Sequence, residues 1–291
     1  GNYAKVNGSI YSSYEGNIED IISNPQNLSN PYKKLEHKEL EVDWDSAFVS
    51  MLNMIKLPND WESYQKKDKI IFGTTGVVTI NNNLYVREIG PENQGFLYID
   101  NRGRDINIVV DSFKVLDWRT VAFLGDGQVN IYVREEFVLT GSSKINWGGD
   151  ASKLRLYYFG KKALNIAGDV KIVGNLLIGE DAVLNLSGSG NVAGAIVSAG
   201  NQINLSGGSN NNAIIVLPKG HFNATNGSVN GVVVADSVYM GGGASFTFAN
   251  FDHSILFPDY TGPGDNGSGG SGPGSAPTLE DLISAGPALV P

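Results

Sequence analysis

Leu164-Asn165-Ile166-Ala167-Gly168 opens a series of four related motifs, in which an asparagine between two apolar residues is followed by a turn. The others are Leu184-Asn185-Leu186-Ser187-Gly188, Ile203-Asn204-Leu205-Ser206-Gly207 and Phe222-Asn223-Ala224-Thr225-Asn226, and the four asparagines lie 20, 19 and 19 positions apart. A second apolar series keeps the same period: Leu176-Leu177-Ile178, Ala195-Ile196-Val197, Ile214-Ile215-Val216 and Val232-Val233-Val234. Two interleaved series with one period indicate a coil that makes one circuit per repeat, which is a parallel β-solenoid (β-helix).

The repeat also predicts which side chains face the interior. Apolar residues on both sides of each asparagine should stack inward from turn to turn; they are Leu164, Ile166, Leu184, Leu186, Ile203 and Leu205. The asparagines between them, Asn165, Asn185, Asn204 and Asn223, should then form an outward ladder. Glycine or asparagine at the corners allows the left-handed backbone that a sharp bend requires. Antiparallel pairing of these runs would contradict this prediction.

Three zones are expected along the all-β chain. Residues 1–69 are polar and charged and form an N-terminal cap region that is partly α-helical and partly irregular. Residues 70–260 contain short β runs broken by glycine and asparagine and form the solenoid domain. Residues 261–291 form a flexible glycine-rich linker that ends in a short apolar docking peptide.

One helix is predicted in the first zone, from about Asp45 to Lys56, where Asp45 caps the apolar residues that follow at helical spacing. This helix should cover an end or a side of the solenoid and bury Phe48, Leu52 and Ile55. A solenoid needs such a cover because an open end exposes unpaired strand groups.

Composition excludes several classes of function. The 291 residues carry 30 Asp and Glu against 21 Lys and Arg, a formal net charge of -9, so nucleic acid is not expected as a partner. The chain has no cysteine, which excludes disulfides, thiolate zinc sites and a cysteine nucleophile. Its apolar runs are far shorter than the roughly 20 residues of a membrane-spanning helix. Because it begins at Gly1 without a methionine, we expect an ectodomain cut from a longer precursor.

Several segments together resemble a known family: Leu154-Arg155-Leu156-Tyr157-Tyr158, Ala167-Gly168-Asp169-Val170, Gly194-Ala195-Ile196-Val197, Gly231-Val232-Val233-Val234-Ala235-Asp236-Ser237-Val238 and Asn250-Phe251-Asp252-His253. They are similar to the C-terminal β-solenoid domain of type IV pilus-associated surface proteins, the PilX-type minor pilins. The resemblance spans roughly residues 154–253, and Val6-Asn7-Gly8-Ser9-Ile10-Tyr11-Ser12 has an early piece of the same pattern. It implies an extracellular protein on the bacterial surface or pilus, with adhesion as its role and no catalytic residues. The family's N-terminal hydrophobic helix is missing from this sequence, and a membrane contact is expected only through such a helix.

Residues that carry chemistry are sparse in the repeat. Asp169, Glu180, Asp181 and Asp236 are candidates for an acid/base set of a polysaccharide lyase or hydrolase, and we interpret them as solvated corner residues. Asp100-Asn101-Arg102-Gly103-Arg104-Asp105 and Gly125-Asp126-Gly127-Gln128-Val129-Asn130 offer oxygen ligands for calcium, but turns favour these residue types for backbone reasons alone. The histidines, His37, His221 and His253, are far apart in the sequence. We expect no catalytic site, no metal and no cofactor.

Aromatic side chains and the tail remain as binding candidates. Trp44, Trp61, Trp118 and Trp147 all precede the repeat, and an exposed tryptophan can stack on a sugar or anchor a protein, although burial is the more frequent fate. In the tail, Leu279, Leu282 and Ile283 share one helical face, and a helix that short is not stable alone. We expect the peptide 276–291 to dock in an apolar groove of the same solenoid or of another pilus or surface-protein subunit.

The leading interpretation is a non-enzymatic surface or pilus-associated β-solenoid that presents a rigid face for adhesion or pilus assembly. The alternative is a carbohydrate-binding or carbohydrate-active module on the same scaffold, with a surface polysaccharide as its ligand. A groove lined by converging carboxylates and tryptophan would favour the alternative. Neutral Asn and Ser ladders on every face would favour the structural role.

Overall fold

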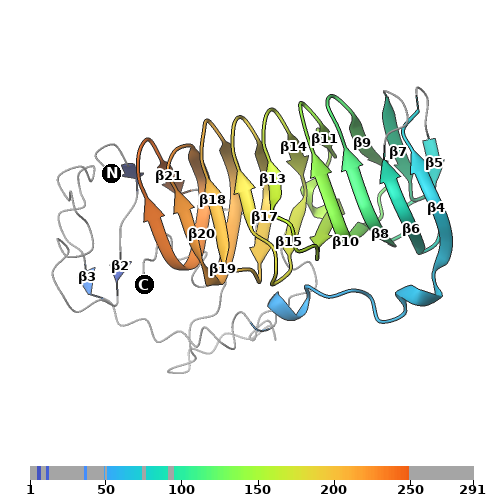
Figure 1. The fold of residues 1–291 in the computed structure, drawn as a ribbon, viewed down its shortest axis with the longest axis horizontal. Coiled ribbons are helices and arrows are strands. Elements are labelled where there is room, and N and C mark those ends of the chain that lie inside the picture. The colour runs from blue at the N-terminus through green and yellow to red at the C-terminus, as the bar shows by residue number, and fades with distance from the viewer. Residues whose placement is uncertain are drawn as a thin grey trace, which may run out of the picture.

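The computed structural model is a long parallel β-coil of about nine turns, stacked along one axis (Figure 1). It describes residues 5–7, 11–12, 36–37, 49, 51–73, 77–90 and 95–248. The strands are β1 (Lys5–Asn7), β2 (Tyr11–Ser12), β3 (Glu36–His37), β4 (Gln65–Ile71), β5 (Val77–Thr79), β6 (Leu84–Gly90), β7 (Phe96–Asp100), β8 (Ile106–Val115), β9 (Thr120–Leu124), β10 (Val129–Leu139), β11 (Lys144–Ile145), β12 (Leu154–Tyr158), β13 (Leu164–Ile166), β14 (Lys171–Val173), β15 (Asn175–Ile178), β16 (Leu184–Leu186), β17 (Asn191–Ser198), β18 (Gln202–Leu205), β19 (Asn210–Ala224), β20 (Ser228–Met240) and β21 (Ser245–Phe248). The predicted solenoid is therefore confirmed.

Each turn of the coil contributes strand segments to three faces, which we name for what lies on them. The strap face contains β12, β15 and the matching parts of the longer strands, from Leu84 on β6 to Ala235 on β20. The ladder face follows it in each turn and contains β13, β16 and β18. The open face comes last and contains β5, β7, β9, β11 and β14, then the starts of β17, β19 and β20, and finally β21.

Inward side chains fill the coil from end to end. Leu164, Ile166, Leu184, Leu186, Ile203 and Leu205 are all fully buried, as predicted. They stack in register, because Leu164 pairs with Leu184 and Leu184 with Ile203. Aromatic residues join the stack in the earlier turns, where the rings of Phe113 and Phe137 lie parallel with centroids 5.3 Å apart. Burial of this continuous apolar column is the main favourable term that holds the turns together.

The corners between the ladder and open faces depend on glycine. Gly168, Gly188 and Gly207 occupy successive turns with φ of 71°, 64° and 67°, a backbone conformation that other residues rarely adopt. A Cβ on Gly188 would come within 2.9 Å of the backbone nitrogen of Gly168. Glycine is therefore required at these corners both for the bend and for the close approach of neighbouring turns.

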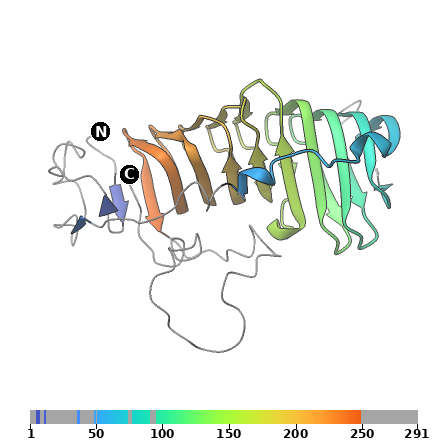
Figure 2. The same ribbon diagram turned by 90° about the horizontal axis from the view of Figure 1, so that it is seen from below.

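A chain segment crosses the outside of the strap face before the coil begins. This segment, residues 51–64, is called the strap; Figure 2 shows it running along the coil from the later turns to the first ones. Residues 51–53 are helical, and the 3-10 helix Trp61–Ser63 lies near its other end. Met51 is buried against Val197 and Val216, and Tyr64 is buried beside Val109 and Tyr132.

The predicted helix is therefore partly confirmed and shorter than expected, since the described helical residues end at Asn53 rather than Lys56. It covers a side of the coil, with Ile55 packed on the core. Leu52 is only half-buried, because Met51 points at the sheet and the next residue of a helix is turned away by about a quarter of a circle. Phe48 lies outside the described residues. Within the described ranges, no helix has the length and apolar character to cross a membrane.

The start of the chain lies at the far end of the coil. Strand β1 pairs in parallel with β21, with Lys5 opposite Ser245 and Asn7 opposite Thr247 (Figure 1). The last turn is thus extended by the first described residues of the sequence, while β4 begins the coil at the opposite end. β2 and β3 form a separate two-stranded parallel sheet.

Candidate functional site on the open face

Exposed apolar side chains gather on the first turns of the open face. Val77 pairs with Tyr98 and Tyr98 with Ala122, so these residues form one outward column across three turns. Phe96 and Leu124 flank the column on either side. We call Val77, Phe96, Tyr98 and Leu124 the aromatic patch. Phe96 is 46% exposed and Val77 56%, which is unusual for large apolar residues on neighbouring strands.

The rings of the patch are held together by one another. The ring centroids of Phe96 and Tyr98 lie 5.8 Å apart at an interplanar angle of 21°, a stacked pair on one strand. Their neighbours Leu97 and Ile99 point inward and are fully buried, which fixes the direction of the outward rings. Trp147 follows on a later turn, 53% exposed, with the Lys144 ammonium 5.8 Å from its ring centre. The patch is therefore a pre-formed surface that needs no rearrangement to meet a partner.

Polar side chains occupy the same face in the later turns. Asn191, Asn210 and Ser228 lie in one outward column, and Asn212 pairs with Asn230 in the next. Within these columns Ser228 Oγ donates to Asn210 Oδ1 at 2.8 Å, and Asn230 Nδ2 donates to Asn212 Oδ1 at 3.2 Å. We call these five residues the amide row. Between Phe96 and Asn191 the same column carries Lys144 and Lys171, so the open face changes from apolar through basic to neutral polar along the coil axis.

The predicted asparagine ladder is confirmed on the ladder face. Asn185 Nδ2 donates to Asn165 Oδ1 and Asn204 Nδ2 to Asn185 Oδ1, both at 2.8 Å, and Asn223 Nδ2 donates to Asn204 Oδ1 at 3.3 Å. Each amide can donate to one neighbour and accept from the other, so identical residues satisfy one another.

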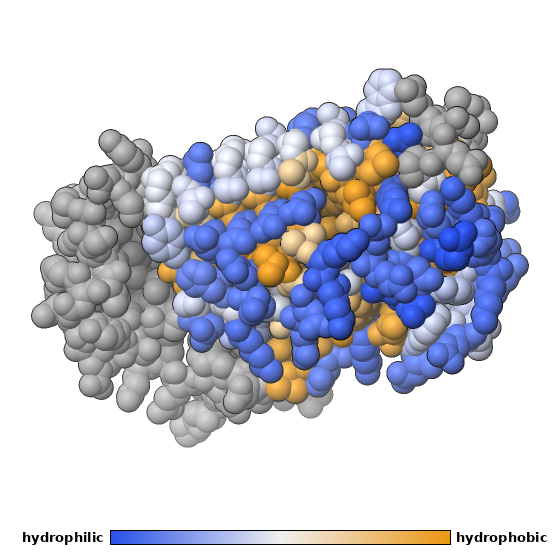
Figure 3. Space-filling model, viewed as in Figure 1, coloured by the Kyte–Doolittle hydropathy of each residue, from blue (hydrophilic) through white to orange (hydrophobic). Residues whose placement is uncertain are grey.

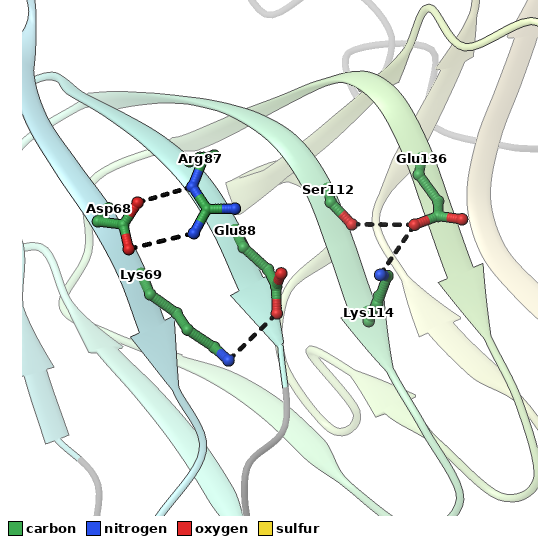
Figure 4. Close-up of polar contacts among 7 residues, drawn as sticks. All are labelled: Asp68, Lys69, Arg87, Glu88, Ser112, Lys114 and Glu136. Atoms are coloured by element: carbon green, nitrogen blue, oxygen red, sulfur yellow. Dashed lines mark hydrogen bonds and ion pairs between the residues drawn. The ribbon is translucent and has the colours of Figure 1, made fainter.

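Charged pairs replace the amides on the first turns of the ladder face, as Figure 4 shows. Arg87 Nε donates to Asp68 at 2.6 Å, and Lys69 Nζ lies 3.3 Å from Glu88. Glu136 accepts from Lys114 and from Ser112. The hydrogen bond from Lys114 lowers the pKa of Glu136 below its usual range. In the view of Figure 3 the hydrophilic surface is more continuous over the first turns, at the right, than over the later ones.

Aromatic residues on the strap face are covered rather than exposed. Tyr132 and Tyr157 stack with ring centroids 4.3 Å apart beneath the strap, and burial raises the pKa of both phenols. Trp61 rests on the Tyr85 ring at 5.5 Å, with the Arg134 guanidinium 4.5 Å from its ring centre. Asp111 accepts from both Tyr85 Oη, at 2.6 Å, and Arg134, at 2.7 Å. Both contacts position residues that meet Trp61.

The four tryptophans therefore have different fates. Trp118 and Trp147 are 59% and 53% exposed, against the more frequent expectation of burial. Trp61 is half-buried in the strap, and Trp44 lies outside the described residues.

Sequence reasoning missed the central residues of the patch, Phe96 and Tyr98. The run Phe96-Leu97-Tyr98-Ile99 could have revealed them. Successive residues of a strand face opposite sides of the sheet, so a strand with one buried side should alternate apolar and polar residues, whereas this run is apolar on both sides.

The candidate acidic residues are dispersed over different corners. Asp169 pairs with Lys171 at 3.0 Å, on the corner between the ladder and open faces. Glu180 and Asp181 are exposed and line a groove of about 380 Å³. Its other lining residues include Lys219 and, from the N-terminal segment, Val49, Leu52, Asn53 and Ile55. Asp236 is exposed three turns further on. The described chain does not converge these carboxylates on one point.

The candidate calcium turns are occupied by contacts within the protein. The Asp100 carboxylate accepts from the backbone and the guanidinium of Arg102, at 2.9 and 3.0 Å. Asn101 is buried and donates to Gly127 O at 2.8 Å, and Asp105 accepts from the Gln128 backbone at 2.7 Å. Over the described ranges no three His, Asp or Glu residues gather in a way that could hold a metal ion.

The remaining candidates are not brought together by the structure. His221 Nδ1 lies 2.8 Å from Ser237 Oγ of the next turn, on the ladder face. The side chain of His37, and all of His253, lie outside the described residues. Leu279, Leu282 and Ile283 of the predicted docking peptide do as well.

A family profile matches residues 57–208, more than half of the chain. The chain belongs to this family, a domain of unknown function (DUF7305). No curated protein and no solved structure matches the chain significantly. The DUF7305 region includes most of the strap, the whole aromatic patch and the first three asparagines of the ladder. These features therefore belong to the part of the chain that defines the family.

Proposed function

We propose that this chain is the non-enzymatic β-solenoid of an extracellular bacterial surface or pilus-associated protein, which presents its open face for adhesion or pilus assembly. The observation that carries the proposal is the aromatic patch, a pre-formed apolar surface on the outside of a coil. Monomeric proteins rarely expose such contiguous apolar surface without using it. A partner that covers Phe96 and Tyr98 would gain the burial of both rings without ordering a loop.

The coil supports this role by holding its faces rigid. Its interior is filled by stacked apolar side chains, and the strap ties together turns that are far apart along the axis. A face built on such strands keeps its side chains at fixed spacing, which suits repeated contact with an extended partner. This rigidity also suits a module that must bear load at a cell surface.

The resemblance to minor pilins supports the surface location. Its opening pair, Tyr157 and Tyr158, has a structural use in this coil, because Tyr157 stacks on Tyr132 under the strap and Tyr158 points into the core. The proposed partners are other pilus or surface-protein subunits, reached through the open face or through the peptide that contains Leu279, Leu282 and Ile283. Contact with a membrane is proposed only through a hydrophobic helix preceding Gly1.

Immunogold labelling of intact native cells tests the surface location. Antibodies raised against the purified chain should label the surface or the pili of cells that have not been permeabilised. A cytoplasmic protein probed in parallel should be labelled only after permeabilisation. If this chain behaves like that cytoplasmic control, the proposed location is wrong.

The alternative, a carbohydrate-binding or carbohydrate-active module, is favoured in its binding form by the exposed rings of Phe96 and Trp147 and the half-buried ring of Tyr98. An active module would use acidic groups such as Glu180 and Asp181. Incubation with pectins, glucans and chitin oligomers should release no reducing sugar above a heat-denatured control. Release that is abolished by Glu180→Gln or Asp181→Asn would establish the enzyme instead.

A further inference from the structure

We propose that the open face binds a neutral polysaccharide laid along the coil axis, with sugar rings on the aromatic patch and sugar hydroxyls on the amide row. The inference rests on the proposed adhesive function and names its ligand. It follows from three properties of the open face: its exposed rings, its polar columns and its pairing of charges.

The aromatic patch fits the apolar side of a sugar. A pyranose with equatorial hydroxyls presents a flat face of C–H groups, and an aromatic ring covers such a face well. Phe96 and Tyr98 offer two rings on one strand, and Val77 and Leu124 extend the apolar surface onto the turns before and after it. Ligand pockets for small molecules are concave, whereas this patch is on a sheet face, so it fits a polymer rather than a single sugar.

The amide row fits the hydroxyl groups of the same polymer. Neighbouring turns are about 4.8 Å apart, close to the length of one sugar residue in an extended chain. The amides of Asn191, Asn210, Asn212 and Asn230 can both donate and accept, as sugar hydroxyls do. The hydrogen bond between Asn230 and Asn212 uses one position on each amide and leaves the others to a ligand. A linear chain could therefore repeat the same contacts turn after turn.

The charges of the open face favour a neutral ligand over an acidic one. Lys171 pairs with Asp169 at 3.0 Å and donates to Ser189 O at 2.8 Å, and Lys144 lies over the Trp147 ring. The Asp100 carboxylate is engaged by Arg102. The net charge of -9 would in addition repel a polyanion. A protein partner fits less well, because beyond the patch and Trp147 the later turns of the face, from Asn191 on, offer no large outward apolar side chain among their described residues. Protein interfaces depend on such anchors at their centre.

Affinity electrophoresis of the full chain tests the proposal. Native gels containing hydroxyethylcellulose, galactomannan or soluble β-1,3-glucan should retard the chain relative to polymer-free gels, and polygalacturonate gels should not. The double variant Phe96→Ala/Tyr98→Ala should bind the retarding polymer about tenfold or more weakly, because it loses both stacking contacts. Asn210→Ala/Asn212→Ala should bind it more weakly by a smaller factor.

Tyr239→Ala is the matched control, since Tyr239 is 50% exposed but lies at the end of the ladder face. It should leave retardation unchanged. Thermal unfolding of each variant shows whether it is folded at the gel temperature. Loss of retardation is interpreted as loss of binding only for variants that are folded at that temperature. No retardation by any of the three neutral polymers, retardation by polygalacturonate alone, or equal retardation of the Phe96/Tyr98 variant would overturn the proposal. Each of these results leaves the immunogold test of the surface location intact.

Discussion

The earlier and later turns of the coil share one interior and differ on the outside. On the ladder face, the turns before Leu164 carry the pairs Asp68–Arg87, Lys69–Glu88 and Lys114–Glu136, whereas the later ones carry the asparagine ladder. Stacked turns place equivalent residues directly beside each other, so identical charges would repel. The charged column on this face therefore keeps its two glutamates apart: it runs from Lys69 to Glu88, then Ser112, then Glu136. Amides can repeat without alternation because each is both donor and acceptor.

The largest expected effect tests whether the interior is equivalent in both regions. Phe113→Ala in the earlier turns should lower the free energy of unfolding by about 3–5 kcal/mol, and Leu186→Ala in the later turns should lower it by about 2–5 kcal/mol, because both side chains are fully buried. Urea unfolding of the two variants measures these losses. A loss below about 1 kcal/mol for either one would contradict continuous packing through the coil.

A glycine comparison separates corner geometry from close stacking. Gly188→Ala should cost about 2–4 kcal/mol, because it combines a φ of 64° with a Cβ placed 2.9 Å from the Gly168 nitrogen. Gly103→Ala in the earlier turns is the control. Its φ is 70°, but nothing lies within 4 Å of the added Cβ, so only about 1–2 kcal/mol of backbone strain is expected. Equal losses in thermal or urea unfolding would show that the corners of the later turns are not tightly stacked.

The asparagine ladder should contribute less than the core. Asn185→Ala removes the hydrogen bonds to Asn165 and Asn204 and should cost about 1 kcal/mol, because these groups are partly exposed. Asn185→Asp should lower the free energy of unfolding more at pH 7 than at pH 4. Only a protonated carboxyl can replace the Asn185 amide as the donor that faces Asn165 Oδ1. Urea titrations at the two pH values check this, and a larger loss at pH 4 would mean that Asn185 does not donate to Asn165.

The smallest effect is expected from the charged pairs. Lys114 lowers the pKa of Glu136 in the folded state. The ionised Glu136 carboxylate therefore stabilises the fold above the ordinary glutamate pKa of about 4.3, and this stabilisation is lost as the pH falls through the folded-state pKa. Glu136→Gln should therefore cost less than about 1 kcal/mol at pH 7 and nothing near pH 2. Urea unfolding of both proteins across this range tests the sign: a difference that persists undiminished in acid would mean that packing, not charge, is lost.

The same contrast explains how much the sequence could predict. Leu156, Leu176, Ile196, Ile215 and Val233 are successive partners 20, 20, 19 and 18 positions apart, and their turns repeat the same residue types. The inward residues and the asparagine ladder followed from that regularity. Leu84, Ile108, Ile131 and Leu156 are also successive partners, but 24, 23 and 25 positions apart. With longer corners and no repeated letters, those turns were predicted only as separate β runs.

The candidate site was harder to predict than the scaffold. Phe96 and Tyr98 alternate with Leu97 and Ile99, so composition alone gives no preference for which pair faces outward. That choice is made by the register with β9, where Leu97 meets Val121 in the core. Likewise the helical segment near Met51 was predicted, but its place along the side of the coil depends on contacts with residues more than 140 positions later.

The pairing of β1 with β21 has a consequence for how the chain is made. Lys5 and Ser245 are 240 positions apart, so the first described strand cannot reach its partner until nearly the whole chain has left the ribosome. Met51 of the strap likewise cannot pack against Val216 and Val234 until those residues have been synthesised. Each intervening turn can form on the turn before it, through contacts between residues about 20 positions apart, which is fast in comparison. Synthesis and folding therefore follow opposite orders here: β1 is translated before every other described strand, but it can pair with β21 only after the other turns have been made.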